Sequence, residues 1–133
     1  MKRILVAYDG GEPGRKALET AIELARGIGA LVSVVSVVPY HPGRSPIDPW
    51  DDRAVHAGEL REARAVLLEA GIAADYLEPS GDPATMIEKL VEELGYDMVI
   101  LGTRGLGAVS RLMQGSVSEH VATHAKATVV IAR

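Results

Sequence analysis

The sequence predicts a three-layer α/β/α domain, Rossmann-like, with a five-stranded parallel sheet between two layers of helices. The main observation is that short runs of β-branched and aliphatic residues alternate with longer segments of helical periodicity along all 133 residues. Right-handed crossovers return each strand beside its neighbours, and sheets of this kind commonly have the strand order 3-2-1-4-5. We therefore expect residues 1–133 to form a single domain.

The first expected elements are a strand, a helix and a second strand. Residues 3–8 are almost wholly apolar, as in a strand covered on both faces. Pro13 suits the first turn of a helix, where its missing N–H is not needed, and Gly27 and Gly29 are suited to end that helix. Residues 31–38 predict the second buried strand.

The middle of the chain begins with an expected loop. Residues 39–49 contain four prolines, which neither helices nor central strands accommodate well. Apolar periodicity then predicts a helix over about residues 53–70, followed by a weaker strand over 72–78. Asp82-Pro83 is a typical helix start and Gly95 a typical helix end, so a third helix is expected between them.

The last elements follow the same alternation. Residues 97–101 predict the fourth strand. Ser116 and Glu119 have the spacing of a capping box, which predicts a short helix beginning at Val117. Residues 128–132 are the fifth expected strand.

Composition excludes several classes of partner. The chain has 14 basic and 18 acidic residues, a net charge of −4, and no basic cluster, so nucleic acid is not an expected partner. Cysteine is absent, which excludes disulfides and thiolate metal sites. Together with the lack of a signal-like apolar run at the N-terminus, this predicts a cytoplasmic protein. No apolar run approaches the roughly 20 residues that cross a bilayer, so no membrane partner is expected.

The segment from Gly102 to Ser116 is the strongest candidate for a ligand site. Ligands of such sheets bind at the carboxyl ends of the strands, near the point where the strand order reverses. Glycines there let backbone N–H groups approach a phosphate, and a helix N-terminus favours negative charge. The same glycines also suit turns, and Ser116 also suits a helix cap, so the residues alone support both interpretations equally.

The spacing G-x2-G-x9-G-[ST], formed by Gly102, Gly105, Gly115 and Ser116, resembles the nucleotide signature of ATP-binding universal stress proteins. The resemblance covers nearly the whole chain, in segments 4–10, 80–84, 96–105 and 115–119. One departure is Lys126-Ala127-Thr128, where members of that family often have Pro-Cys-Pro.

The resemblance implies specific roles for individual residues. Asp9 would lie at the adenosine end, and Val38 would offer backbone groups to adenine. Gly102 and Gly105 would flank the ribose and first phosphates, while Gly115 and Ser116 would hold the outer phosphates. The full expected binding set is Asp9, Val38, Gly102, Arg104, Gly105, Gly115, Ser116, Val117 and Ser118, with ATP as the ligand and Mg²⁺ as its companion.

These expectations favour an ATP-responsive binding module in the stress response. No acidic residue lies between Gly102 and Ser118, so the segment lacks a general base and we expect at most slow hydrolysis, with no catalytic residue assigned. Two alternatives stay open: a true ATP-hydrolysing enzyme, and a nucleotide-free interaction protein.

His120 and His124 have the i, i+4 spacing that can chelate a metal on a helix. The sequence offers no third histidine, cysteine or intervening catalytic glutamate beside them, which favours a solvated or half-buried pair, so no metal site is assigned.

Residues 128–132 are expected at a sheet edge and contain neither proline nor charge. Such edges invite pairing with another strand, which predicts a homodimer through this strand. The resembling family is commonly dimeric by this route. A substitution such as Val130→Pro would then be expected to weaken association.

Overall fold

The computed structural model describes residues 3–8, 10–38, 53–102 and 115–132. Four helices and five strands alternate along these residues, and the strands form one parallel sheet in the order β3-β2-β1-β4-β5, as the sequence predicts. The elements are β1 (Arg3–Ala7), α1 (Glu12–Ile28), β2 (Leu31–Val35), α2 (Arg53–Glu69), β3 (Ala74–Leu77), α3 (Pro83–Leu94), β4 (Met98–Gly102), α4 (Gly115–His124) and β5 (Thr128–Ala132).

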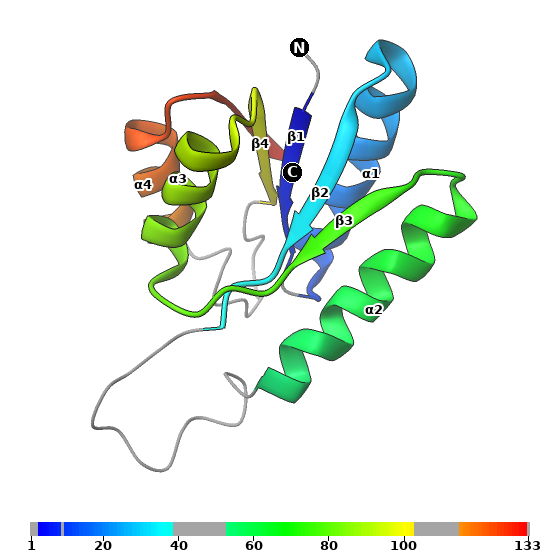
Figure 1. The fold of residues 1–133 in the computed structure, drawn as a ribbon, viewed down its shortest axis with the longest axis horizontal. Coiled ribbons are helices and arrows are strands. Elements are labelled where there is room, and N and C mark those ends of the chain that lie inside the picture. Colours follow the sequence, from blue (N-terminus) through cyan, green and yellow to red (C-terminus); the bar gives the residue numbers. More distant parts are fainter. Residues whose placement is uncertain (1–2, 9, 39–52, 103–114, 133) are drawn as a thin grey trace.

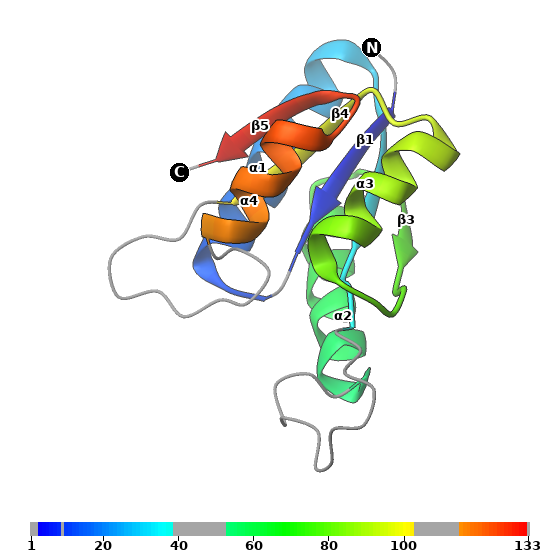
Figure 2. The same ribbon diagram turned by 90° about the vertical axis from the view of Figure 1, so that its left-hand side faces the viewer.

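The helices cover both faces of the sheet (Figures 1 and 2). Helices α1 and α2 lie on one face and α3 and α4 on the other. Because alternate side chains of a strand point to opposite faces, β1 contributes Ile4 and Val6 to the first core and Leu5 and Ala7 to the second. All four side chains are completely buried, which explains why the strand is apolar throughout.

Capping residues fix the ends of α3 as the sequence predicts. The Asp82 carboxylate accepts hydrogen bonds from the Thr85 N–H at 3.1 Å and from the Thr85 hydroxyl at 2.9 Å. Pro83 occupies the first turn, and Gly95 ends the helix in the left-handed region at φ 71°. Both ends of α3 are therefore determined by local chemistry.

Several element boundaries differ from the sequence prediction. Strand β2 ends at Val35 rather than residue 38, because β1 ends at Ala7 and the Tyr8 N–H makes the last bond to Val35 at 3.0 Å. Strand β3 begins at Ala74, since the Ile72 N–H donates to Leu67 and completes the end of α2.

Two helix boundaries also differ. Gly27 lies inside α1, and Gly29 alone ends that helix, at φ 68°. Helix α4 begins at Gly115, two residues before the expected start at Val117. Ser116 therefore lies within the first turn of α4 and does not precede the helix as its N-cap. None of the helices in the described ranges is both long and apolar enough to cross a membrane.

Candidate functional site

The carboxyl ends of the parallel strands meet at one edge of the sheet, where the arrowheads of β1, β2 and β3 point the same way in Figure 1. Strand order reverses between β1 and β4, which run side by side although they are separated by two strands in the sequence. The backbone that follows these two strands defines the candidate site, because open α/β sheets bind ligands at such a switch point. We call this region, where β1 ends at Ala7 and β4 ends at Gly102, the switch-point edge.

Gly102 ends β4 at the switch-point edge and is needed there for packing. A Cβ at this position would lie 1.9 Å from the Pro13 carbonyl oxygen in the first turn of α1. The clash is with backbone, so a side chain could not be accommodated by a rotamer change. This glycine of the expected nucleotide signature therefore brings β4 against the start of α1.

Val38 uses both of its backbone groups within the protein. Its N–H donates to the Pro79 carbonyl at 2.8 Å, and its own carbonyl accepts from the Gly81 N–H at 3.0 Å. Both partners lie in the connection from β3 to α3. In a parallel strand the N–H and C=O of one residue point to the same neighbour and those of the next residue to the other. The backbone groups of Val37 are thus directed toward the β1 side.

The N-termini of α1 and α4 carry different charge. Helix α1 starts after Gly11, which has no side chain to cap the helix, and its first turn contains Glu12. Helix α4 begins at Gly115 and has no acidic residue in its first turn. A helix N-terminus is the positive end of the helix dipole, and an acidic side chain there opposes the binding of an anion. The start of α4 is therefore the more favourable of the two for a phosphate.

Four of the expected binding residues, Gly115, Ser116, Val117 and Ser118, lie in the first turns of α4. Val117 is half-buried and packs against the core under α3 and α4. Ser118 is 8% exposed, although it is a polar residue. The backbone of Gly115 and Ser116 belongs to the same turns, and the expected residues Asp9, Arg104 and Gly105 lie outside the described residues.

A surface cavity of about 410 Å³ lies beside the end of β1, between α1 and α2. Its lining includes Tyr8, Glu12, Arg15 and Glu62. The Tyr8 hydroxyl donates to Glu62 at 3.2 Å, and burial together with the Glu62 charge raises the pKa of Tyr8 to about 12. With two carboxylates and one guanidinium in its lining, this cavity does not favour a highly charged anion.

A buried polar group that the sequence analysis did not identify lies close to the same edge. The imidazole Nδ1 of His56 is 2.7 Å from the Ser36 hydroxyl and 3.0 Å from a Glu59 carboxylate oxygen. Glu59 also packs against Gly10, where a Cβ would lie 2.8 Å from its Oε2. No local motif joins the three residues, since Ser36 follows β2 and the other two lie on α2.

The arrangement of Ser36, His56 and Glu59 differs from a catalytic triad. In a triad one imidazole nitrogen faces the serine and the other faces the acid. Here Nδ1 contacts both, and Nε2 is buried without a hydrogen-bond partner in the described part of the protein. Ser36 is moreover completely buried. The group does not have the geometry for acyl transfer.

Comparison with known proteins agrees with the fold. The sequence profile described as "Universal stress protein family" matches residues 1–133. A universal stress protein of Thermus aquaticus, encoded in the 3′ region of a QAH/OAS sulfhydrylase, is 33% identical over 99% of this chain and 98% of its own length.

Two solved structures share the fold. One is a universal stress protein family protein of Arabidopsis thaliana with AMP bound, 22% identical, with a TM-score of 0.73 over 99% of this chain and 91% of the other. The other is the universal stress protein of Archaeoglobus fulgidus in complex with dAMP, also 22% identical, with a TM-score of 0.73 over 100% and 98%. On the profile and the Thermus relative, the chain belongs to the universal stress protein family.

Proposed function

We propose that this universal stress protein binds ATP across the switch-point edge and acts as a nucleotide-responsive module. The observation that carries the proposal is the start of α4 at Gly115, with no acid in its first turn, after the glycine-bearing segment that follows β4. The AMP and dAMP complexes of two proteins with the same fold support an adenine nucleotide as the ligand class.

The phosphates belong at α4 rather than at α1. The first turn of α1 carries Glu12, and the cavity beside it is lined by Glu62 as well, so a triphosphate there would meet two carboxylates. The first turn of α4 offers backbone N–H groups and small residues, Gly115 and Ser116, without opposing charge. Arg104 and Gly105 of the signature would complete the phosphate end, and Gly102 would support it by packing against α1.

The adenine belongs beside the end of β2. The Val38 amide hydrogen is already donated to Pro79, so we assign recognition of the base to the backbone of Val37, whose groups are directed toward β1. Backbone recognition between aliphatic walls needs no aromatic side chain, which suits a chain with only 4% aromatic residues. Asp9 would then contact the adenosine end.

Turnover of bound ATP should be slow. Between Gly102 and Ser118 the sequence has no acid to act as general base, and the nearby His56 is already in contact with both Ser36 and Glu59. Mg²⁺ would accompany the nucleotide, because this ion is held mainly through phosphates and one or two carboxylates. A rate of many turnovers per second, abolished by Asp9→Asn, would instead make the protein an ATPase.

Calorimetry with ATP tests the proposal through Gly115. Charge-assisted bonds to the phosphates and burial of adenine predict an affinity of roughly 1 μM. Gly115→Asp places a negative charge at the phosphate position and should weaken binding at least tenfold, while a carboxylate at a helix N-terminus favours the helix itself. The neutral control Gly115→Asn should weaken it less. Equal affinity of wild type and Gly115→Asp would contradict the placement.

We also propose that two copies associate through β5, which lies at the edge of the sheet. The Thr128 N–H donates to Asp97 at 3.1 Å, so alternation directs Val130 toward β4 and directs Val129 and Ile131 toward the open edge. Val130→Pro would therefore break a bond inside the sheet, and the informative substitution is Ile131→Pro.

Sedimentation velocity tests the association. The wild-type chain should sediment as a dimer and Ile131→Pro as a folded monomer, because the substitution removes an outward donor. A wild-type monomer at high concentration, or a dimer that Ile131→Pro leaves intact, would refute an interface through β5. We also propose that the protein is located in the cytoplasm, as expected from the lack of cysteine. Fractionation of cells that produce the chain would test this location.

A further inference from the structure

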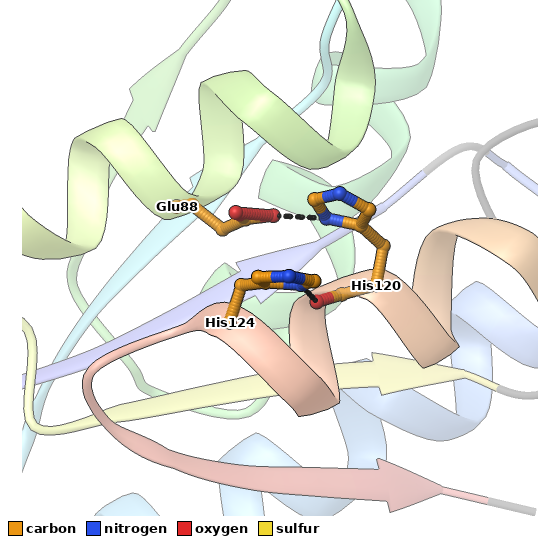
Figure 3. Close-up of side chains that lie close together, drawn as sticks. All are labelled: Glu88, His120 and His124. Atoms are coloured by element: carbon orange, nitrogen blue, oxygen red, sulfur yellow. Dashed lines mark hydrogen bonds and ion pairs between the residues drawn. The ribbon is translucent and has the colours of Figure 1, made fainter.

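Three side chains from two helices gather on the outer face of the molecule, away from the switch-point edge. Glu88 comes from α3, and His120 and His124 from α4 (Figure 3). One potential ligand atom from each lies within 4.8 Å of the other two. We propose that Glu88, His120 and His124 form a binding site for a divalent transition metal of the zinc class.

The orientation of His124 is already that of a metal ligand. Its Nδ1 lies 2.9 Å from the backbone carbonyl of His120, as the dashed line in Figure 3 marks. A carbonyl oxygen can only accept, so Nδ1 carries the hydrogen and Nε2 presents its lone pair. Metal-binding histidines almost always make such a bond through the nitrogen that does not bind the metal.

His120 and Glu88 would provide the other two ligands. The His120 Nδ1 lies 2.6 Å from Glu88 Oε2, and the two histidine rings stack with centroids 4.2 Å apart and planes inclined by 25°. On binding, His120 would change tautomer: Nδ1 gives up the hydrogen that it donates to Glu88, Nε2 takes up a hydrogen from solvent, and the Nδ1 lone pair bonds to the metal. Modest rotation of the side chains brings the three ligands around one ion, because two of them are exposed.

The ligand set indicates the class of metal. Two imidazole nitrogens and one carboxylate suit Zn²⁺ and its neighbours Co²⁺, Ni²⁺ and Cu²⁺, whereas Mg²⁺ and Ca²⁺ prefer oxygen ligands alone. Three protein ligands leave a fourth position for water. The group also lies at the C-terminal end of α4, of which His124 is the last residue, where the helix dipole favours a cation.

The site would join α3 to α4 without using any residue of the proposed nucleotide site. Glu88 and His120 are 32 residues apart in the sequence, and the structure already connects them by a hydrogen bond. A bound ion would replace this single contact by three bonds to one centre. The proposal therefore does not depend on whether the protein binds ATP.

Calorimetry with ZnCl₂ and the untagged full chain tests the site, together with visible spectroscopy of Co²⁺ added to the same protein. The wild type should bind one ion per chain, and Co²⁺ should give ligand-field bands that Zn²⁺ abolishes. Glu88→Gln and His124→Gln should each lower the Zn²⁺ affinity by roughly tenfold or more. Losing a residue that only hydrogen-bonds to a metal ligand already has an effect of about this size, and losing the ligand itself should have an effect at least as large.

Glu119→Gln is the matched control, since Glu119 is an exposed carboxylate beside His120 in the sequence and is not one of the three ligands. It should leave the affinity within twofold of the wild type. Circular dichroism should be unchanged in all three variants. Absence of stoichiometric Zn²⁺ binding would overturn the proposal. So would a Glu88→Gln variant with wild-type affinity, because the histidine pair alone would then account for binding.

Discussion

The two ends of helix α4 are suited to opposite charges by different means. At its N-terminal end the chain offers backbone N–H groups and small residues, Gly115 and Ser116, with no acid in the first turn. At its C-terminal end it offers the side chains of His120 and His124, joined by Glu88 from the neighbouring helix. The first arrangement suits an anion and the second a cation, and the helix dipole favours both.

The difference teaches how far each kind of site is visible in a sequence. A backbone site leaves a local trace, because glycines and small residues must recur at fixed spacing where the chain approaches a ligand. A side-chain site assembled from two helices leaves only part of such a trace. His120 and His124 are recognisable as an i, i+4 pair, whereas Glu88 becomes their neighbour only when α3 packs against α4.

The largest effect should come from filling the switch-point edge at Gly102. A Cβ would lie 1.9 Å from the Pro13 carbonyl oxygen, so Gly102→Ala must displace backbone and should lower the free energy of unfolding by about 3 kcal/mol. Urea denaturation measures it. This result would establish that one glycine of the nucleotide signature serves packing.

Gly27→Ala is the control for that substitution. Gly27 lies inside α1, and an added methyl group there would meet nothing within 4 Å, so the change should raise the free energy of unfolding by roughly 0.5–1 kcal/mol through helix propensity. If Gly102→Ala were as stable as wild type, the close approach of β4 to α1 would be wrong.

A smaller effect concerns Tyr8, beside the same edge. Its pKa is raised to about 12 by burial and by Glu62, against an ordinary value of 10. The protonated hydroxyl therefore contributes stability that is fully present below pH 10 and is lost as the pH rises through about 12. The loss should reach roughly 2 kcal/mol.

Tyr8→Phe isolates this contribution. At neutral pH the variant should be about 1 kcal/mol less stable, because the hydrogen bond to Glu62 is missing. Between pH 10 and 12 its stability should fall less steeply than that of the wild type. Parallel pH profiles of the two proteins, from urea titrations, would show that Tyr8 ionises without a penalty and would contradict the assignment.

The smallest expected effects are those of a substitution at one end of α4 on the binding of a ligand at the other end. His124→Gln should change the ATP affinity less than twofold, and Gly115→Asp should change the Zn²⁺ affinity less than twofold, since the two positions lie at opposite ends of the helix. Calorimetry measures both. A tenfold effect in either direction would show that the two ends are coupled and do not act as separate sites.

The fold was predictable because each element carries its own local signals. Pro83 and Gly95 bound α3, and the continuous burial of an apolar strand such as β1 follows from helices on both faces of the sheet. The errors occur where a tertiary partner decides. Strand β2 stops at Val35 where β1 ends, a limit set by the neighbouring strand that no local pattern could indicate.

The same distinction between local signals and tertiary contacts applies to the candidate site. The sequence located the switch-point edge and the start of α4 to within two residues, since both depend on glycines near a helix start. It could not indicate that Gly102 packs against Pro13, that Ser36 meets His56, or that Glu88 reaches His120. Each of these is a contact between residues distant in sequence, with no spacing rule to reveal it.

The most direct test of the account is a nuclear magnetic resonance titration of the isotope-labelled chain, first with ATP and then with Zn²⁺. ATP should shift the amide signals of Val117 and Ser118 while leaving the ring signals of His120 and His124 unchanged. Zn²⁺ should do the reverse. If ATP shifted no signal in the first turns of α4, or if both ligands shifted the same set of signals, the assignment of separate sites to the two ends of α4 would be contradicted.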